Sequence, residues 1–289
     1  MGAKTVNKLA VPGATLHYEV TGSGPVLLLI PGGATDAAVY DGIVGRLAAD
    51  YTVVTYDPRG NSRSRPDDSA VFPGRRPVGT VDEEVARSAE DALALIHEVS
   101  GDGPAYVFGS GSGAITGLEL ITRWPDRVRL LVAHEPPCVE LLPDVVDARA
   151  FFQDVHDTYT RDGVEAADLL FTIGTGLDDD AMPPAEDLLP EYRDLAERMQ
   201  ANAATFYQHK LLPFTRYQPD LDALKLVADK LVPAAGLTSA EHLPARPVHH
   251  IATHIGWPVV TFPGAHTGYA THPIPFATLL ARLLETEGS

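Results

Sequence analysis

Three short segments of the chain each follow an apolar run and carry groups that could move protons or bind a carbonyl. Residues 109–113 read Gly-Ser-Gly-Ser-Gly, Glu135 follows the run at 127–133, and His266 follows the run at 258–262. Histidine accepts or delivers a proton near neutral pH. A carboxylate that binds one ring nitrogen leaves the other nitrogen free to do so. If the fold brings these segments together, they could carry out acid–base chemistry.

The elements that would position these residues are read from hydrophobic patterning. Apolar runs alternate with amphipathic stretches, which is typical of buried parallel strands joined by helices. Residues 14–20 alternate in polarity and predict an exposed or edge antiparallel strand. The other predicted strands are residues 26–30, 51–56, 105–108, 127–133, 230–235 and 258–262, and the predicted helices are 36–49, 81–99, a helix from 114 to about 124, 247–255 and 273–284. Sites in parallel sheets form beyond the carboxyl ends of the strands, where the three segments lie.

Residues 138–225 interrupt this alternation. They contain predicted helices around 146–160, 163–171 and 190–210 but no convincing strand. We therefore expect a core made of residues 1–137 and 226–289, with 138–225 as a helical cap. Phe206, Tyr207 and Tyr217 belong to the richest aromatic stretch of this cap. They could line an apolar substrate pocket or simply pack in the cap, and the sequence leaves both readings open.

The order of the motifs resembles the α/β-hydrolase superfamily over essentially the whole chain. The motifs are Pro31-Gly32-Gly33, Asp57-Pro58-Arg59-Gly60-Asn61-Ser62, the glycine-rich run at 109–113, the cap insertion, and Pro263-Gly264-Ala265-His266 before the last helix. This resemblance implies an α/β fold with a mainly parallel central sheet, helices on both faces and a helical cap.

The resemblance also shows a departure at position 111. The family's G-x-S-x-G elbow holds a nucleophilic serine, but in Gly109-Ser110-Gly111-Ser112-Gly113 that position is Gly111. Three alternatives stay open: chemistry without a protein nucleophile, a glycine that replaces a catalytic serine, or a shifted frame in which Ser112 attacks.

The family's other roles transfer to positions of this chain. His266 corresponds to the general base. Its orienting acid is expected at Glu135, with Glu241 as the alternative. Gly33 and Ser112 correspond to the backbone donors of the oxyanion hole, and Ser110 is expected beside the substrate.

We therefore expect an enzyme of small-molecule metabolism, with secondary metabolism as one option, that acts on a carbonyl-containing substrate without a cofactor. The first alternative is an ester or lactone hydrolase whose serine at position 111 is replaced by Gly. The second is a non-catalytic small-molecule binding protein. No metal site is expected, since His250 and His254 lack a third ligand and the run Asp178–Asp180 lacks calcium-loop spacing.

Composition limits the partners. The chain has 289 residues and a formal net charge of −17, which disfavours nucleic acid. Without a membrane-length apolar stretch or a leader, and with one cysteine, we expect a cytoplasmic protein with no membrane partner, and we leave a homodimer open. Abundant Arg, Ala, Gly and Pro, together with a resemblance to actinobacterial hydrolase-like proteins that tailor polyketides, favour a bacterial source.

Overall fold

The computed structural model describes residues 3–67, 81–177 and 190–285. The run Asp178–Asp180 lies outside these ranges. Within the described residues no helix is long and apolar enough to cross a membrane.

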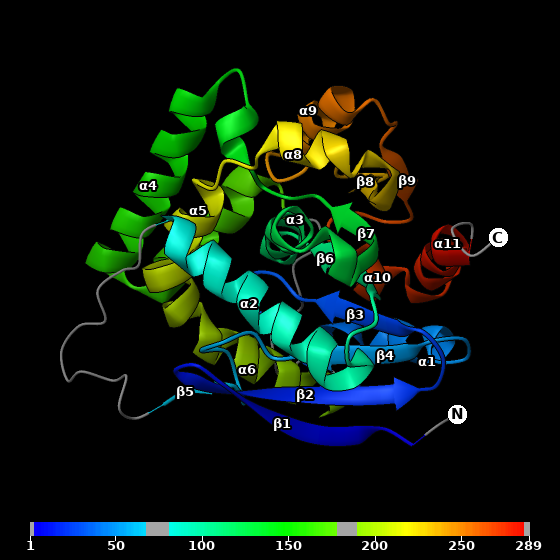
Figure 1. The fold of residues 1–289 in the computed structure, drawn as a ribbon. Coiled ribbons are helices and arrows are strands. Elements are labelled where there is room, and N and C mark those ends of the chain that lie inside the picture. The colour runs from blue at the N-terminus through cyan, green and yellow to red at the C-terminus, as the bar shows by residue number, and fades with distance from the viewer. Residues whose placement is uncertain (1–2, 68–80, 178–189, 286–289) are drawn as a thin grey trace.

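A mostly parallel sheet forms the centre of the described chain (Figure 1). Its nine strands are β1 Thr5–Val11, β2 Ala14–Gly22, β3 Val26–Ile30, β4 Thr52–Tyr56, β5 Arg65–Pro66, β6 Ala105–Ser110, β7 Val128–His134, β8 Leu231–Gly236 and β9 Val260–Phe262. Their order is β1-β2-β4-β3-β6-β7-β8-β9, with β5 paired to β2. The strands from β4 to β9 in this order are parallel, whereas β1, β2 and β5 pair antiparallel. The α/β-hydrolase fold expected from the motifs is confirmed.

Helices cover both faces of the sheet, which explains why the central strands are apolar throughout. The core helices are α1 Asp41–Leu47, α2 Val81–Ser100, α3 Ser112–Arg123, α8 Leu221–Leu226, α9 Arg246–Ile255, α10 Gly268–Thr271 and α11 Pro273–Glu285. On one face, alternate residues of β3 pack with α2, α3 and α9. On the other face, the intervening residues pack with α1 and α11. All five residues of β3 are buried as a result.

A helical cap is inserted between β7 and β8, over the carboxyl ends of the parallel strands (Figure 1). It contains α4 Val145–Asp162, α5 Val164–Thr175, α6 Pro190–Thr205, a π-helical turn at Phe206–Lys210 and α7 Leu211–Thr215. Buried apolar residues of these elements, with Val139 and Leu142, form a separate cluster. The cap therefore has its own small core and covers the edge where the site should lie.

The structure differs from the sequence expectations in three elements. The edge strand is β1, which the sequence reading missed, and β2 lies inside it. The helix expected at 36–49 is a short 3-10 turn, Ala37–Tyr40, followed by α1. Helix α8 falls within the expected cap range, yet its Leu224 packs in the core cluster with Ile251 and Ile255.

Candidate active site

The bend between β6 and α3 has the shape of a nucleophile elbow. Gly111 has φ 58° and ψ −126°, a region that L side chains rarely adopt, and its N–H donates to the His134 carbonyl at 3.0 Å. The flanking glycines are required by close packing. A β-carbon on Gly109 would collide with the Gly113 carbonyl, and one on Gly113 with the Ile30 carbonyl. The elbow therefore presses directly against β3.

Position 111 itself has room for a side chain and faces a base. The neighbours of a β-carbon built on Gly111 are the His266 ring atoms Nε2, at 3.2 Å, and Cε1, at 3.5 Å. Such a contact needs a shift of only a few tenths of an ångström in the ring. The His266 Nε2 thus faces the place where the family's nucleophile would project.

Glu135 contacts the Nδ1 side of the His266 ring, away from the Nε2 atom that faces Gly111. Its Oε2 lies 2.6 Å from His266 Nδ1, and its Oε1 accepts hydrogen bonds from the Gly236 N–H at 2.7 Å and the Ser239 hydroxyl at 2.5 Å. The alternative acid, Glu241, is exposed on the loop after β8. The structure therefore brings Glu135, and not Glu241, to His266.

The ionised carboxylate of Glu135 favours the His266 tautomer that carries its proton on Nδ1. Burial by itself would raise the Glu135 pKa, but the hydrogen bond and charge of His266, with the charge of His134 and the Ser239 hydroxyl, lower it to about 2. An ionised carboxylate can only accept hydrogen bonds, so His266 Nδ1 must be the donor. In the neutral ring, Nε2 then carries the lone pair that faces Gly111.

A second histidine lies beneath this pair. His134 is buried, and burial lowers its pKa to about 4, so it stays neutral at pH 7. Its Nδ1 lies 3.2 Å from the Ser110 hydroxyl. His134, Glu135 and His266 each offer a ligand atom within 4.8 Å of the others, but Glu135 and His266 already bind each other. The arrangement is better suited to proton transfer than to metal binding.

The two residues expected to donate to an oxyanion, Gly33 and Ser112, lie next to each other at the elbow. Gly33 follows β3 with φ 59°, and its N–H donates to the Ser112 hydroxyl at 2.9 Å. The Ser112 N–H begins α3, and no acceptor for it is recorded among residues 3–67, 81–177 and 190–285. The Ser112 hydroxyl therefore lies against the Gly33 donor, on the side of the elbow where an oxyanion would bind. A substrate oxygen would have to replace this hydroxyl as the partner of Gly33.

A mainly apolar cavity of about 230 Å³ lies between the elbow and the cap. Its floor includes Gly33, Gly111, Ser112 and His266, and its cap wall includes Phe152, Phe171, Phe206, Tyr207 and Leu211. Ser110 also borders the cavity, although its hydroxyl contacts His134. The expectation for Tyr217 needs correcting: it does not border this cavity, and its ring packs in the core while its hydroxyl donates to Glu119 at 2.7 Å.

Two contributors were missed by the sequence reading. Ser239, which holds Glu135, lies in the Gly236–Ser239 segment, where a small polar residue follows a strand. Asn61 lies in the quoted Asp57–Ser62 motif, and its amide donates to the Thr35 and Gly33 carbonyls at 2.8 and 3.3 Å. Both act on the loops that hold the site.

Comparison with known proteins agrees with this fold. A family model described as alpha/beta hydrolase fold matches residues 25–173, and the chain belongs to this family. It is an enzyme of the α/β-hydrolase fold.

Two relatives match over most of the chain. An uncharacterized hydrolase, YraK, of Bacillus subtilis (strain 168) is 34% identical over 98% of both chains. A zearalenone hydrolase of Cladophialophora bantiana is 29% identical over 93% of this chain and 92% of its own. Among solved structures, a thermophilic esterase from Thermogutta terrifontis has a TM-score of 0.69 at 19% identity, covering 99% of this chain and 100% of its own, which supports the fold.

Proposed function

We propose that the protein hydrolyses a carboxylic ester or lactone of a small, partly apolar molecule, with His266 acting as general base on water. The observation that supports this best is the His266 Nε2, oriented by Glu135, which faces Gly111 at the floor of the cavity. The similarity to a zearalenone hydrolase over most of the chain also favours a hydrolytic reaction.

The proposed reaction follows from these positions. The substrate carbonyl oxygen binds the Gly33 and Ser112 N–H groups, which stabilise the charge that develops on it. His266 Nε2 removes a proton from water as the water oxygen bonds to the carbonyl carbon. Glu135 stabilises the resulting imidazolium. When the tetrahedral intermediate collapses, His266 returns the proton to the leaving alkoxide, giving an acid and an alcohol, or one hydroxy acid from a lactone.

Position 111 decides the form of the mechanism. With glycine there, no covalent acyl-enzyme forms at that residue. The same site with a serine at 111 would carry out ordinary covalent ester hydrolysis, so both alternatives share their base, acid and oxyanion donors.

The test is a panel of aryl esters and lactones, assayed with the protein, His266→Ala and His250→Ala. His250 lies exposed on α9 and serves as a matched control. We expect His266→Ala to lose at least 100-fold in turnover, the lower bound for general-base catalysis, and His250→Ala to retain it. Turnover that survives His266→Ala would refute the proposal. Ligand binding without turnover in every protein would instead favour a binding function.

A further inference from the structure

A lysine of the cap contacts a core residue that in turn binds the loop carrying the Gly33 donor. Lys210 ends the π-helical turn Phe206–Lys210 between α6 and α7. Its Nζ donates to the Asn61 side-chain oxygen at 2.6 Å. Asn61 is fully buried and lies in the core segment after β4, so this contact joins the cap to the core next to the loop that carries Gly33.

The contact leaves the Asn61 amide only one consistent orientation. An ammonium group can only donate, so the Asn61 oxygen must face Lys210. The Asn61 NH₂ group then faces the Thr35 and Gly33 carbonyls, which can only accept. Asn61 thereby holds the loop that carries the Gly33 donor at two of its carbonyls.

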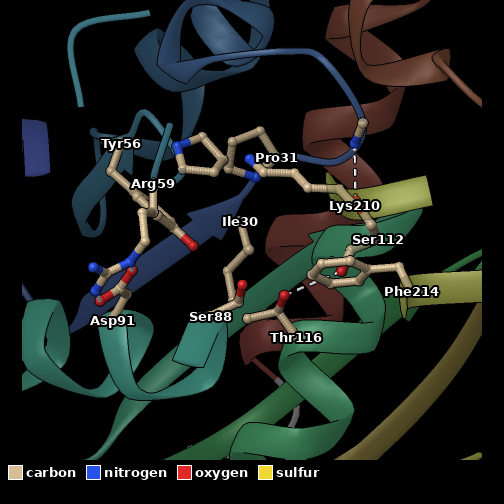
Figure 2. Close-up of a pocket in the computed structure, with 12 residues that line it drawn as sticks. Ile30, Pro31, Tyr56, Arg59, Ser88, Asp91, Ser112, Thr116, Lys210 and Phe214 are labelled. Carbon is tan, nitrogen blue, oxygen red and sulfur yellow. Dashed lines mark hydrogen bonds and ion pairs between the residues drawn. The ribbon is translucent and has the colours of Figure 1, made fainter. Parts of the chain in front are cut away.

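Within residues 3–67, 81–177 and 190–285, no carboxylate forms an ion pair with Lys210. Arg59 and Asp91 form a two-pronged ion pair at 2.6 and 3.0 Å, so these neighbours largely satisfy each other. The remaining charge that acts on Lys210 is Glu84 on α2. A cavity of about 20 Å³, enough for about one water, is bordered by Lys210 together with Gly33 and Ser112 (Figure 2). Tyr56, Ser88 and Thr116 also border this cavity.

We propose that Lys210 is a positioning residue for the oxyanion hole: through Asn61 it fixes the loop that carries Gly33, and its charge borders the same small cavity as both oxyanion donors. This inference rests on the proposed function. A positive charge there stabilises the transition state more than the ground state, because the oxyanion charge develops only during the reaction. The effect is therefore expected in kcat more than in KM.

The protonation of Lys210 provides a specific signature. Burial lowers its pKa to about 8, while Glu84 and Asp91 oppose that shift and Arg59 adds to it. The ammonium form is present below this pH and is lost as the pH rises through it. Turnover that depends on the charge should therefore decline near pH 8.

The experiment compares Lys210→Met, Lys210→Arg and Lys225→Met with the unmodified protein. Lys225 is an exposed lysine on α8 and controls for the loss of a lysine. kcat and KM are measured on an aryl ester between pH 6 and 10, and thermal melting confirms folding. Affinity for the carboxylate 4-phenylbutyrate, measured by calorimetry at pH 7 and pH 9, reports on the oxyanion hole without turnover.

We expect Lys210→Met to lower kcat about tenfold at pH 7, below the effect of deleting a direct donor, and to remove the decline near pH 8. Lys210→Arg stays charged and should move that decline to higher pH. If Lys210→Met matches Lys225→Met in kcat and pH profile, the inference is refuted while the proposed function stands. If no ester is hydrolysed, the proposed function fails, and the affinity for 4-phenylbutyrate then tests the role of Lys210 by itself. A weaker affinity at pH 7 in Lys210→Met than in Lys225→Met supports the role of Lys210, and equal affinities exclude it.

Discussion

Replacing Gly111 by serine tests the site most directly, because the structure predicts a loss in stability and a gain in activity. At φ 58° and ψ −126°, a residue with a β-carbon costs about 1–3 kcal/mol in backbone strain. The contact at 3.2 Å between that β-carbon and His266 Nε2 requires a small shift of the ring. We therefore expect a folded protein whose melting temperature is lower by a few degrees.

The gain comes from the hydroxyl. A serine oxygen at this position could reach His266 Nε2 within the 2.6–3.2 Å of a nucleophile–base pair. Removing the nucleophile from a serine triad costs about 10⁶ in turnover, so restoring it should raise ester hydrolysis by several orders of magnitude. An acyl-enzyme should appear as a burst of about one product per site and as an added acyl mass.

Gly111→Ala is the matched control, since it introduces the same strain and the same β-carbon without the hydroxyl. It should share the stability loss and show no burst. If Gly111→Ser is no more active than Gly111→Ala and carries no acyl group, residue 111 is not the nucleophile position of this fold.

Three further predictions concern the surroundings of the site. Glu135→Gln removes the acceptor that fixes the His266 tautomer, so turnover should fall by up to about 10⁴. The lowered Glu135 pKa, about 2, contributes stability that is complete above its ordinary value of 4.5 and is lost as the pH falls toward 2. The free energy of unfolding in urea should therefore change less between pH 2 and 6 in Glu135→Gln than in the parent protein. Equal pH dependence in the two proteins would contradict a lowered Glu135 pKa. The pKa of Lys210 is about 8 in the folded protein, against an ordinary 10.5. Between these two pH values the unfolded chain binds more protons than the folded chain, so the free energy of unfolding should rise by up to about 3 kcal/mol as the pH increases from 8 to 10.5. Lys210→Met should lack that rise in urea titrations at pH 8 and 10.5, and a rise equal to that of the parent would count against a buried ammonium. Gly113→Ala drives a β-carbon into the Ile30 carbonyl and should destabilise the protein by more than about 2 kcal/mol in thermal melting, whereas Gly103→Ala, whose β-carbon would lie 3.3 Å from the Ser100 carbonyl, should not approach that loss.

The parts of the fold that the sequence predicts well are those whose residues experience one environment along their length. Strands β3, β6 and β7 are buried on both faces, so their apolar runs stand out and the bends after them can be located. Gly111 and Glu135 follow such strands, whereas His266 follows β9, which is only partly buried. Their proximity could therefore be expected from topology before any contact was known.

Other features depend on contacts between distant parts of the chain. Strand β1 is mostly exposed and is defined by its pairing with β2, so it carries no apolar run. Tyr217 has the composition of a pocket residue, but only the packing of the cap onto the core decides that it contacts Glu119. Lys210 and Asn61 are 149 residues apart, and no periodicity links them.

Three polar contacts of the cap hold the loop after β3, which carries the Gly33 donor. Arg198 binds the buried Asp36 at 2.5 Å, Asn202 donates to the Ala34 carbonyl at 2.8 Å, and Lys210 reaches the loop through Asn61. Breaking a buried charged contact costs more than breaking one at the surface, since the remaining charge loses its partner. Moving α6 away from the core would therefore disturb the Gly33 donor along with the cavity wall. Under the proposed function the cap would contribute to catalysis as well as to substrate selection, because helix α6, which borders the cavity, also holds the loop that carries the Gly33 donor.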